Sequence, residues 1–212
     1  GDGGITTSAP ATLTVNNVVP SAASASGPYA ISEGDGLSLA GSGSDPVDLL
    51  SYSWDLNGDL IFGDATGASP TLTWAQLVAL GIADGPAVSD VRLRIDDGDG
   101  GVSTSAATTL TLSNLAPTAA IAAAVSAQFR GETVNYTLTA LDPSLADQAG
   151  SFTWDVDWDN NGVWDQTIVG PSGTIVAHAF ATTGTRTIAV RATDDDGATR
   201  SEERRVGKEC LR

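Results

Sequence analysis

The stretch SFTWDVDWDNNGVWD at residues 151–165 alternates large apolar side chains with acids. Successive side chains of a β-strand point to opposite faces of the sheet, so this alternation predicts a strand with one apolar face and one acidic face. We expect Trp154 to lie in a protein core, because Trp buries more apolar area than other side chains. We expect the acids of the other face to meet solvent: Asp155, Asp157 and Asp159.

The same pattern occurs earlier in the chain, as SYSWD at residues 51–55, where Trp54 takes the place of Trp154. Other segments recur at a similar offset: GDGGITTSAPATLTVNNVVP (1–20) returns as GDGGVSTSAATTLTLSNLAP (98–117). A repeat of roughly a hundred residues matches one small β-sandwich domain. We therefore predict four segments: 1–20 as the last strand of a preceding repeat, 21–114 as one sandwich, 115–199 as a second sandwich without its last strand, and 200–212 as a tail.

The composition predicts short strands and many turns. The chain of 212 residues is 41% hydrophobic but only 6% aromatic, with 24 Gly and 9 Pro. An exception is TWAQLVALG (73–81), where Thr73 can cap the start of a helix and Gly81 its end. The predicted fold class is therefore all-β, with tandem immunoglobulin-like sandwiches and one short helix in the first full repeat.

The charge of the chain limits its partners. Its 26 acids outnumber its 10 bases, and the formal net charge is −16. Such a chain repels nucleic acid and anionic membranes but attracts divalent cations. No apolar run reaches the ~18 residues of a membrane-spanning helix, so we expect no membrane insertion of this segment.

The last thirteen residues, RSEERRVGKECLR (200–212), differ from the rest. They contain five of the ten bases and the only Cys, Cys210. From Arg200 to Cys210 they resemble one translated reading frame of a common sequencing adapter, which predicts a non-native tail. A genuine basic C-terminal tail is the alternative.

The hairpin after Trp154 has the spacing of calcium ligands. Acids and amides alternate before a Gly, as in the DxDxDGxxD loops of integrin α-subunits, which this segment resembles. The predicted Ca²⁺ ligands in this copy are Asp155, Asp157, Asp159, Asn161 and Asp165. In the first copy they are Asp55, Asn57, Asp59 and Asp64, although Leu60 stands where Gly is wanted. The alternative is a solvated acidic hairpin built from Asn, Asp and Gly turns.

Two segments resemble polycystic kidney disease (PKD) domains. HAFATTGTRTIAVRATDDDG (178–197) is similar to the family's ending, and GPYAISEGDGLSLAGSGSDP (27–46) with YSWDLNGD (52–59) to its opening and Trp-Asp signature. The resemblance implies immunoglobulin-like sandwiches with Trp54 and Trp154 as core signature residues. It also implies extracellular tandem repeats that act as spacers or interaction modules in bacterial surface proteins and secreted hydrolases.

The residue inventory does not favour catalysis. The chain has one His, His178, without a nucleophile motif, and too few His and Cys for a zinc site. We therefore expect no enzyme but a secreted or cell-surface spacer or adhesive segment, stiffened by calcium. Its partners would be neighbouring repeats, glycans, or host or matrix proteins. The alternative is a carbohydrate- or protein-binding accessory module of a secreted hydrolase, with Trp164 stacking on the ligand.

Overall fold

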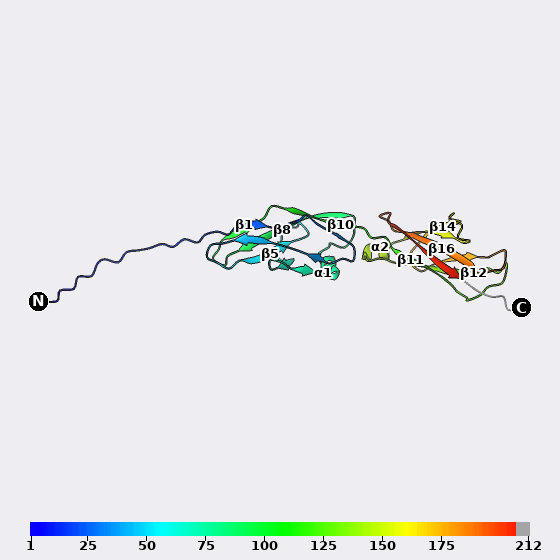
Figure 1. Cartoon of the computed structure of the whole chain (residues 1–212), viewed down its shortest axis with the longest axis horizontal. Coiled ribbons are helices and arrows are strands. Elements are labelled where there is room, and N and C mark those ends of the chain that lie inside the picture. The colour runs from blue at the N-terminus through cyan, green and yellow to red at the C-terminus, as the bar shows by residue number, and fades with distance from the viewer. Residues whose placement is uncertain (207–212) are drawn as a thin grey trace.

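Two β-sandwiches lie end to end in the structure, a computed structural model that describes residues 1–206, with side chains described as far as Ser201 (Figure 1). An extended segment, residues 1–20, leads from the N-terminus to the first sandwich (Figure 1). The end of the predicted foreign tail, 207–212, lies outside the described residues. The fold is all-β with immunoglobulin-like sandwiches, as predicted.

The first sandwich consists of short strands in opposing sheets. Its strands are β1 (Ser21–Ser24), β2 (Tyr29–Ser32), β3 (Leu37–Ser38), β4 (Ser42–Ser44), β5 (Ser51–Asp55), β6 (Ala65–Thr66), β7 (Thr71–Leu72), β8 (Ala87–Asp96), β9 (Val102–Thr104) and β10 (Thr108–Ser113). The larger sheet has the order β2-β10-β8-β5-β6, with β9 also paired to β8. β2 runs parallel to β10, and the other pairs are antiparallel. The pairs β1-β4 and β3-β7 form two further, small sheets.

The core of the first sandwich is built around Trp54, which is fully buried and donates a hydrogen bond from Nε1 to the carbonyl of Gly67 at 2.9 Å. Leu93 and Ile95 of β8 pack in the same core. A Cβ at Gly41 would lie 2.6 Å from Leu93 Cδ2 and 2.8 Å from the Trp54 ring, so a larger residue there would force the core to shift. The backbone therefore approaches the aromatic ring more closely than a side chain would allow.

The predicted helix is present as α1 (Trp74–Ala79). Thr73 is its N-cap residue, and the Gln76 side chain accepts a hydrogen bond from the Thr73 N–H at 2.9 Å. Gly81 follows the helix with φ of +80°, a conformation that glycine adopts without strain. The buried Leu77 attaches the helix to the first core.

The second sandwich has a simpler topology. Its strands are β11 (Thr118–Ala123), β12 (Val134–Leu141), β13 (Phe152–Asp157), β14 (Gln166–Gly170), β15 (Thr174–His178), β16 (Arg186–Thr193) and β17 (Thr199–Val206). One sheet has the order β11-β12-β15 and the other β14-β13-β16-β17, with antiparallel pairs throughout. Trp154 is fully buried between them, and its Nε1 donates to the Gly170 carbonyl at 2.9 Å.

Two details differ from the predictions, and one prediction stays open. Residues 1–20 form no strand within the described chain, and their assignment to the last strand of a preceding repeat stays a prediction. Sandwich 2 does have a last strand: β17 runs from Thr199 into the tail and pairs along the whole of β16. Backbone hydrogen bonds suffice for this pairing, so it bears on neither proposed origin of the tail. A second helix, α2 (Leu145–Ala149), was not predicted, because one turn and a half is too short to show a periodic pattern.

Candidate functional site

The second-copy hairpin brings three of its five predicted ligands together. Single oxygens of Asp157, Asp159 and Asp165 lie within 4.8 Å of one another. Asn161 instead accepts the Val163 N–H at 2.8 Å, as in an Asn-initiated turn. The hairpin therefore combines features of the predicted site and of its alternative, the hydrogen-bonded acidic turn.

The carboxylate of Asp157 accepts hydrogen bonds from the backbone of this hairpin. Its Oδ1 accepts the N–H groups of Asp159 and Asn161, both at 3.2 Å, and its Oδ2 accepts that of Gly162 at 2.8 Å. Burial alone would raise the pKa of Asp157, but these backbone donors outweigh it and hold the pKa below its ordinary value. Both oxygens thus already have partners, and a cation would have to share or replace them.

Asp155 does not join the predicted ligand set. Its Oδ2 pairs with Arg191 Nη2 at 2.6 Å, and its Oδ1 accepts the Thr167 hydroxyl at 2.5 Å. The expectation that these acids face solvent is wrong for Asp155 and Asp157, which are 7% and 2% exposed. They are buried because each finds ionic or backbone partners beneath the sheet surface.

The predicted ligands of the first-copy hairpin accept hydrogen bonds from the backbone of their own turn. Asp55 is fully buried and accepts the N–H groups of Gly58 at 2.9 Å and Leu60 at 3.2 Å. Asp64 accepts the Leu56 N–H at 2.7 Å. Asp59 and Asn57 accept backbone N–H groups of residues two positions ahead, so they also serve the turn. Among the described residues, no group of three acids at ligand distance includes a first-copy hairpin residue.

Strand pairing explains how the two copies differ. Asp55 lies opposite Arg92, and Asp155 lies opposite Arg191, in matching registers. Asp55 also caps its hairpin, whereas in the second copy β13 extends two residues further and Asp157 caps the hairpin. Asp55 thus both lies opposite an Arg and caps its hairpin, whereas in the second copy Asp155 lies opposite the Arg and Asp157 caps the hairpin.

Trp164, the predicted stacking residue, is half-buried. The guanidinium of Arg191 lies 4.7 Å from the centre of its ring. This cation–π contact covers one ring face, so that face is not available to a sugar.

The two sandwiches contact each other through the α1 and α2 regions. Trp74 of α1 donates from Nε1 to the Pro143 carbonyl at 3.2 Å. The Ser144 hydroxyl donates to Asp84 Oδ1 at 2.7 Å and also caps the N-terminus of α2. A short linker thus joins sandwiches that also share direct side-chain contacts.

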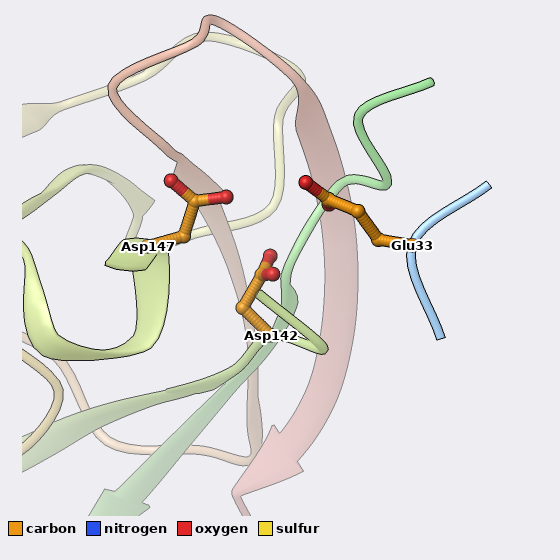
Figure 2. Close-up of side chains that lie close together, drawn as sticks. All are labelled: Glu33, Asp142 and Asp147. Carbon is orange, nitrogen blue, oxygen red and sulfur yellow. The ribbon is translucent and has the colours of Figure 1, made fainter. Parts of the chain in front are cut away.

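Acids from both sandwiches converge at this junction. Glu33 of sandwich 1 and Asp142 and Asp147 of sandwich 2 point their carboxylates toward a common space (Figure 2), with ligand oxygens within 4.8 Å of one another. A second group at the same distance joins Asp147 to Asp84 and Asp196. We call the whole set the junction cluster; its residues are Glu33, Asp84, Asp142, Asp147 and Asp196.

The pKa values of two acids in the junction cluster are raised. Burial raises the pKa of Asp142 to about 6, and nearby carboxylates add to the rise. Burial raises the pKa of Asp147 to about 8, again with a contribution from neighbouring acids. Asp147 is 2% exposed, and its Oδ2 has no hydrogen-bond partner. Carboxylates that lie this close together repel one another, and a bound cation would relieve this repulsion.

A related group occurs at the other end of sandwich 1, where Asp45, Asp48 and Asp97 lie within 4.8 Å of one another. Here Asn17 of the N-terminal segment donates to Asp97 Oδ2 at 2.8 Å. This hydrogen bond is the main reason why the pKa of Asp97 is lowered. The group differs from the junction cluster in that one sandwich supplies all three acids.

The sequence prediction missed the junction cluster. The segments that supply it, around Glu33, Asp84 and Asp147, are far apart in sequence and follow no ligand spacing. One signal was available: Asp142 and the DDDG turn at 194–197 both fall at the ends of predicted strands. Acids at strand ends that meet a neighbouring repeat are candidates for a shared site.

His178 belongs to an aromatic group at the far end of sandwich 2. Its ring stacks on Trp158 with centroids 4.1 Å apart and meets the edge of Phe180 at 4.6 Å. Burial lowers the pKa of His178. A cavity of about 490 Å³ adjoins this group, lined in part by Phe129, Tyr136 and Phe180.

The described part of the chain contains no helix long and apolar enough to span a membrane. No family model matches the chain, and no curated protein matches it. Among solved structures, the chain is similar to fibronectin(III)-like modules of Clostridium thermocellum CbhA, at 16% identity and a TM-score of 0.35, covering 86% of this chain and 91% of that one. It is similar to the amphioxus IgVJ-C2 molecule at 13% identity and a TM-score of 0.42, covering 85% and 100%. It is also similar to the Yersinia pseudotuberculosis adhesin InvE at 12% identity and a TM-score of 0.32, covering 85% and 57%.

Proposed function

We propose that this chain is a non-catalytic, extracellular tandem-repeat segment of the PKD type, which acts as a spacer or adhesive module in a larger bacterial surface or secreted protein. The observation that carries the proposal is the end-to-end contact of two sandwiches with separate cores. Repeats that contact only their neighbours build long, extended chains. Neighbouring repeats of the same protein are therefore the first partners that we propose.

The titratable groups support a structural role. The His178 ring contacts the rings of both Trp158 and Phe180, so aromatic packing accounts for its position. The buried acids of the two hairpins, Asp55 and Asp157, accept backbone N–H groups within their own turns. Groups that satisfy local backbone donors stabilise a fold and need no substrate to explain them.

Small-angle X-ray scattering of the whole chain tests the proposal. A spacer of two packed sandwiches gives an elongated particle whose maximum dimension exceeds twice that of one sandwich once the extended N-terminal segment is included. A compact particle with the sandwiches folded side by side would contradict it.

An accessory module that binds glycans or proteins is the second candidate. The cavity beside Phe129 and Phe180 favours it, because ligand sites are concave and mostly apolar with a few polar groups. Arg191 covers one face of the Trp164 ring, so only the other face is open to a ligand of this candidate. A glycan array probed with wild-type chain and with Phe129→Ala separates the two functions: binding that the variant loses supports the accessory module.

A further inference from the structure

The junction cluster contains buried carboxylate oxygens without partners. Glu33, 1% exposed, accepts the N–H groups of Gly85 at 2.7 Å and Leu115 at 2.9 Å. Asp147 and Asp142 differ, because Oδ2 of each is buried and accepts no hydrogen bond. None of the ion pairs among the described side chains involves a residue of this cluster. A buried carboxylate of this kind needs a proton or a cation.

The distances within each of the two groups that share Asp147 suit one ion. Oxygens bound to one Ca²⁺ each lie 2.3–2.6 Å from it, so two of them are at most about 5 Å apart. Both groups that contain Asp147 meet this limit, since their ligand oxygens lie within 4.8 Å. Asp147 stands between the two groups and faces acids of both sandwiches. In Figure 2 its carboxylate points across the gap toward Glu33, with Asp142 below.

We propose that the junction cluster binds a divalent cation that bridges the two sandwiches, and that this cation is Ca²⁺. Asp147 is the central ligand, with Asp142 and Asp196 from its own sandwich. Asp84 and Glu33 are the ligands from sandwich 1. This proposal deepens the proposed function, on which it rests, because a bridging ion would stiffen the contact between neighbouring repeats.

The donor atoms select the ion. All five ligands are carboxylates, and hard oxygen donors suit Ca²⁺ and Mg²⁺ rather than Zn²⁺ or copper. Ca²⁺ accepts six to eight oxygens in irregular geometry, whereas Mg²⁺ demands a regular octahedron and keeps several waters. Carboxylates that arrive from three separate segments of sandwich 2 and two of sandwich 1 fit the more adaptable ion.

The other acidic groups among the described residues do not combine unpartnered buried oxygens with acids from both sandwiches. The oxygens of Asp157 in the second-copy hairpin already accept backbone N–H groups. In the group at the far end of sandwich 1, Oδ2 of Asp45 is also buried without a partner, but Asp97 has Asn17 as a partner and all three acids come from one sandwich. Only the junction cluster, among the groups found in the described residues, joins acids of both sandwiches.

Calorimetric titration of the whole chain with CaCl₂ tests the proposal. Asp147→Asn should weaken the junction binding event about tenfold or more, because it removes the central charged ligand. Asp84→Asn should weaken the same event, because sandwich 1 also supplies ligands. The matched control Asp90→Asn removes an exposed acid that pairs with Arg92, and should leave Ca²⁺ affinity unchanged. Asp159→Asn identifies any weaker Ca²⁺ binding at the second-copy hairpin, because it should change that binding and not the binding at the junction.

Two outcomes would overturn the proposal. Equal Ca²⁺ affinity in wild type and Asp147→Asn would show that the proposed site does not exist. Unchanged affinity in both Asp84→Asn and Glu33→Gln would show that sandwich 1 supplies no ligand and that no ion bridges the sandwiches. Asn has the shape of Asp, and circular dichroism with a melting curve in EDTA shows whether each variant is folded. If scattering shows an elongated chain but no Ca²⁺ binds at the junction, only the proposed metal site is contradicted. If the chain is compact and binds Ca²⁺, only the proposed spacer function is contradicted.

Discussion

Ser144 and Asp84 form a hydrogen bond of 2.7 Å across the junction, while the same Ser144 hydroxyl caps helix α2. Ser144→Ala should therefore lower the free energy of unfolding of sandwich 2 by about 1 kcal/mol through the lost cap, and should also loosen the junction. Denaturant unfolding measures the first effect, and the distance between spin labels in the two sandwiches measures the second.

Ser172→Ala is the control for this prediction. The Ser172 hydroxyl bonds Ala140 within sandwich 2, so its loss should lower stability without changing the distance between the sandwiches. The same loosening in both variants would show that Ser144 has no special role at the junction.

Each sandwich has its own core, so core mutations should act locally. Trp54→Ala and Trp154→Ala each remove a fully buried side chain and should cost about 3–5 kcal/mol, in sandwich 1 and sandwich 2 respectively. Hydrogen exchange followed by mass spectrometry assigns the loss to segments. Equal loss of protection in both sandwiches from either variant would contradict separate cores. Trp164→Ala, at a half-buried site, should cost less.

Asp157 should stabilise the second-copy hairpin without any metal. Asp157→Ala leaves several backbone N–H groups without their acceptor and should cost about 1–3 kcal/mol in EDTA. Asp159→Ala, at an exposed position of the same hairpin, is the matched control and should cost little. Because the pKa of Asp157 is lowered by folding, its contribution is present above about pH 4 and is lost as pH falls through the lower folded pKa. If the two variants had equal stability, the backbone role of Asp157 would be wrong.

The junction cluster should make the protein less stable at higher pH when no cation is present. Folding raises the pKa of Asp142 to about 6 and of Asp147 to about 8, above an ordinary value of about 3.9. Their favourable contribution is complete below pH ~4 and is lost as pH rises through these folded values. The acids that face them are Glu33, Asp84, Asp194, Asp195 and Asp196.

Melting curves in EDTA between pH 4 and 8.5 measure this effect. Wild type should lose melting temperature as pH rises, and Asp147→Asn should lose less, because the amide carries no charge to bury. Parallel profiles for the two proteins would mean that Asp147 does not titrate in this range.

The alternation of residues predicted the interior of both sandwiches but not the state of their acids. Trp54 and Trp154 are buried as the period-two pattern requires, and Thr73 and Gly81 bound α1 as capping rules predict. The pattern also placed Asp155 in solvent, because periodicity gives the face of a side chain and not its partner. Arg191, in a strand far along the chain, supplies that partner.

Contacts between the repeats lay beyond sequence reasoning for a similar reason. Local spacing directed attention to the hairpin acids, whereas the junction cluster depends on how two folded sandwiches meet. Glu33 and Asp147 have no shared motif, and α2, which carries Asp147, is too short to be recognised from periodicity. Tertiary packing alone brings them within ligand distance.

Pulsed electron spin resonance with one spin label in each sandwich measures the distance between the sandwiches, and so shows whether a cation holds the junction. We expect a narrow distance distribution in Ca²⁺ that broadens in EDTA, because the direct contacts then act without the bridging ion. A distribution that is equally broad with and without Ca²⁺ would contradict it, since the two sandwiches would then move as independent domains.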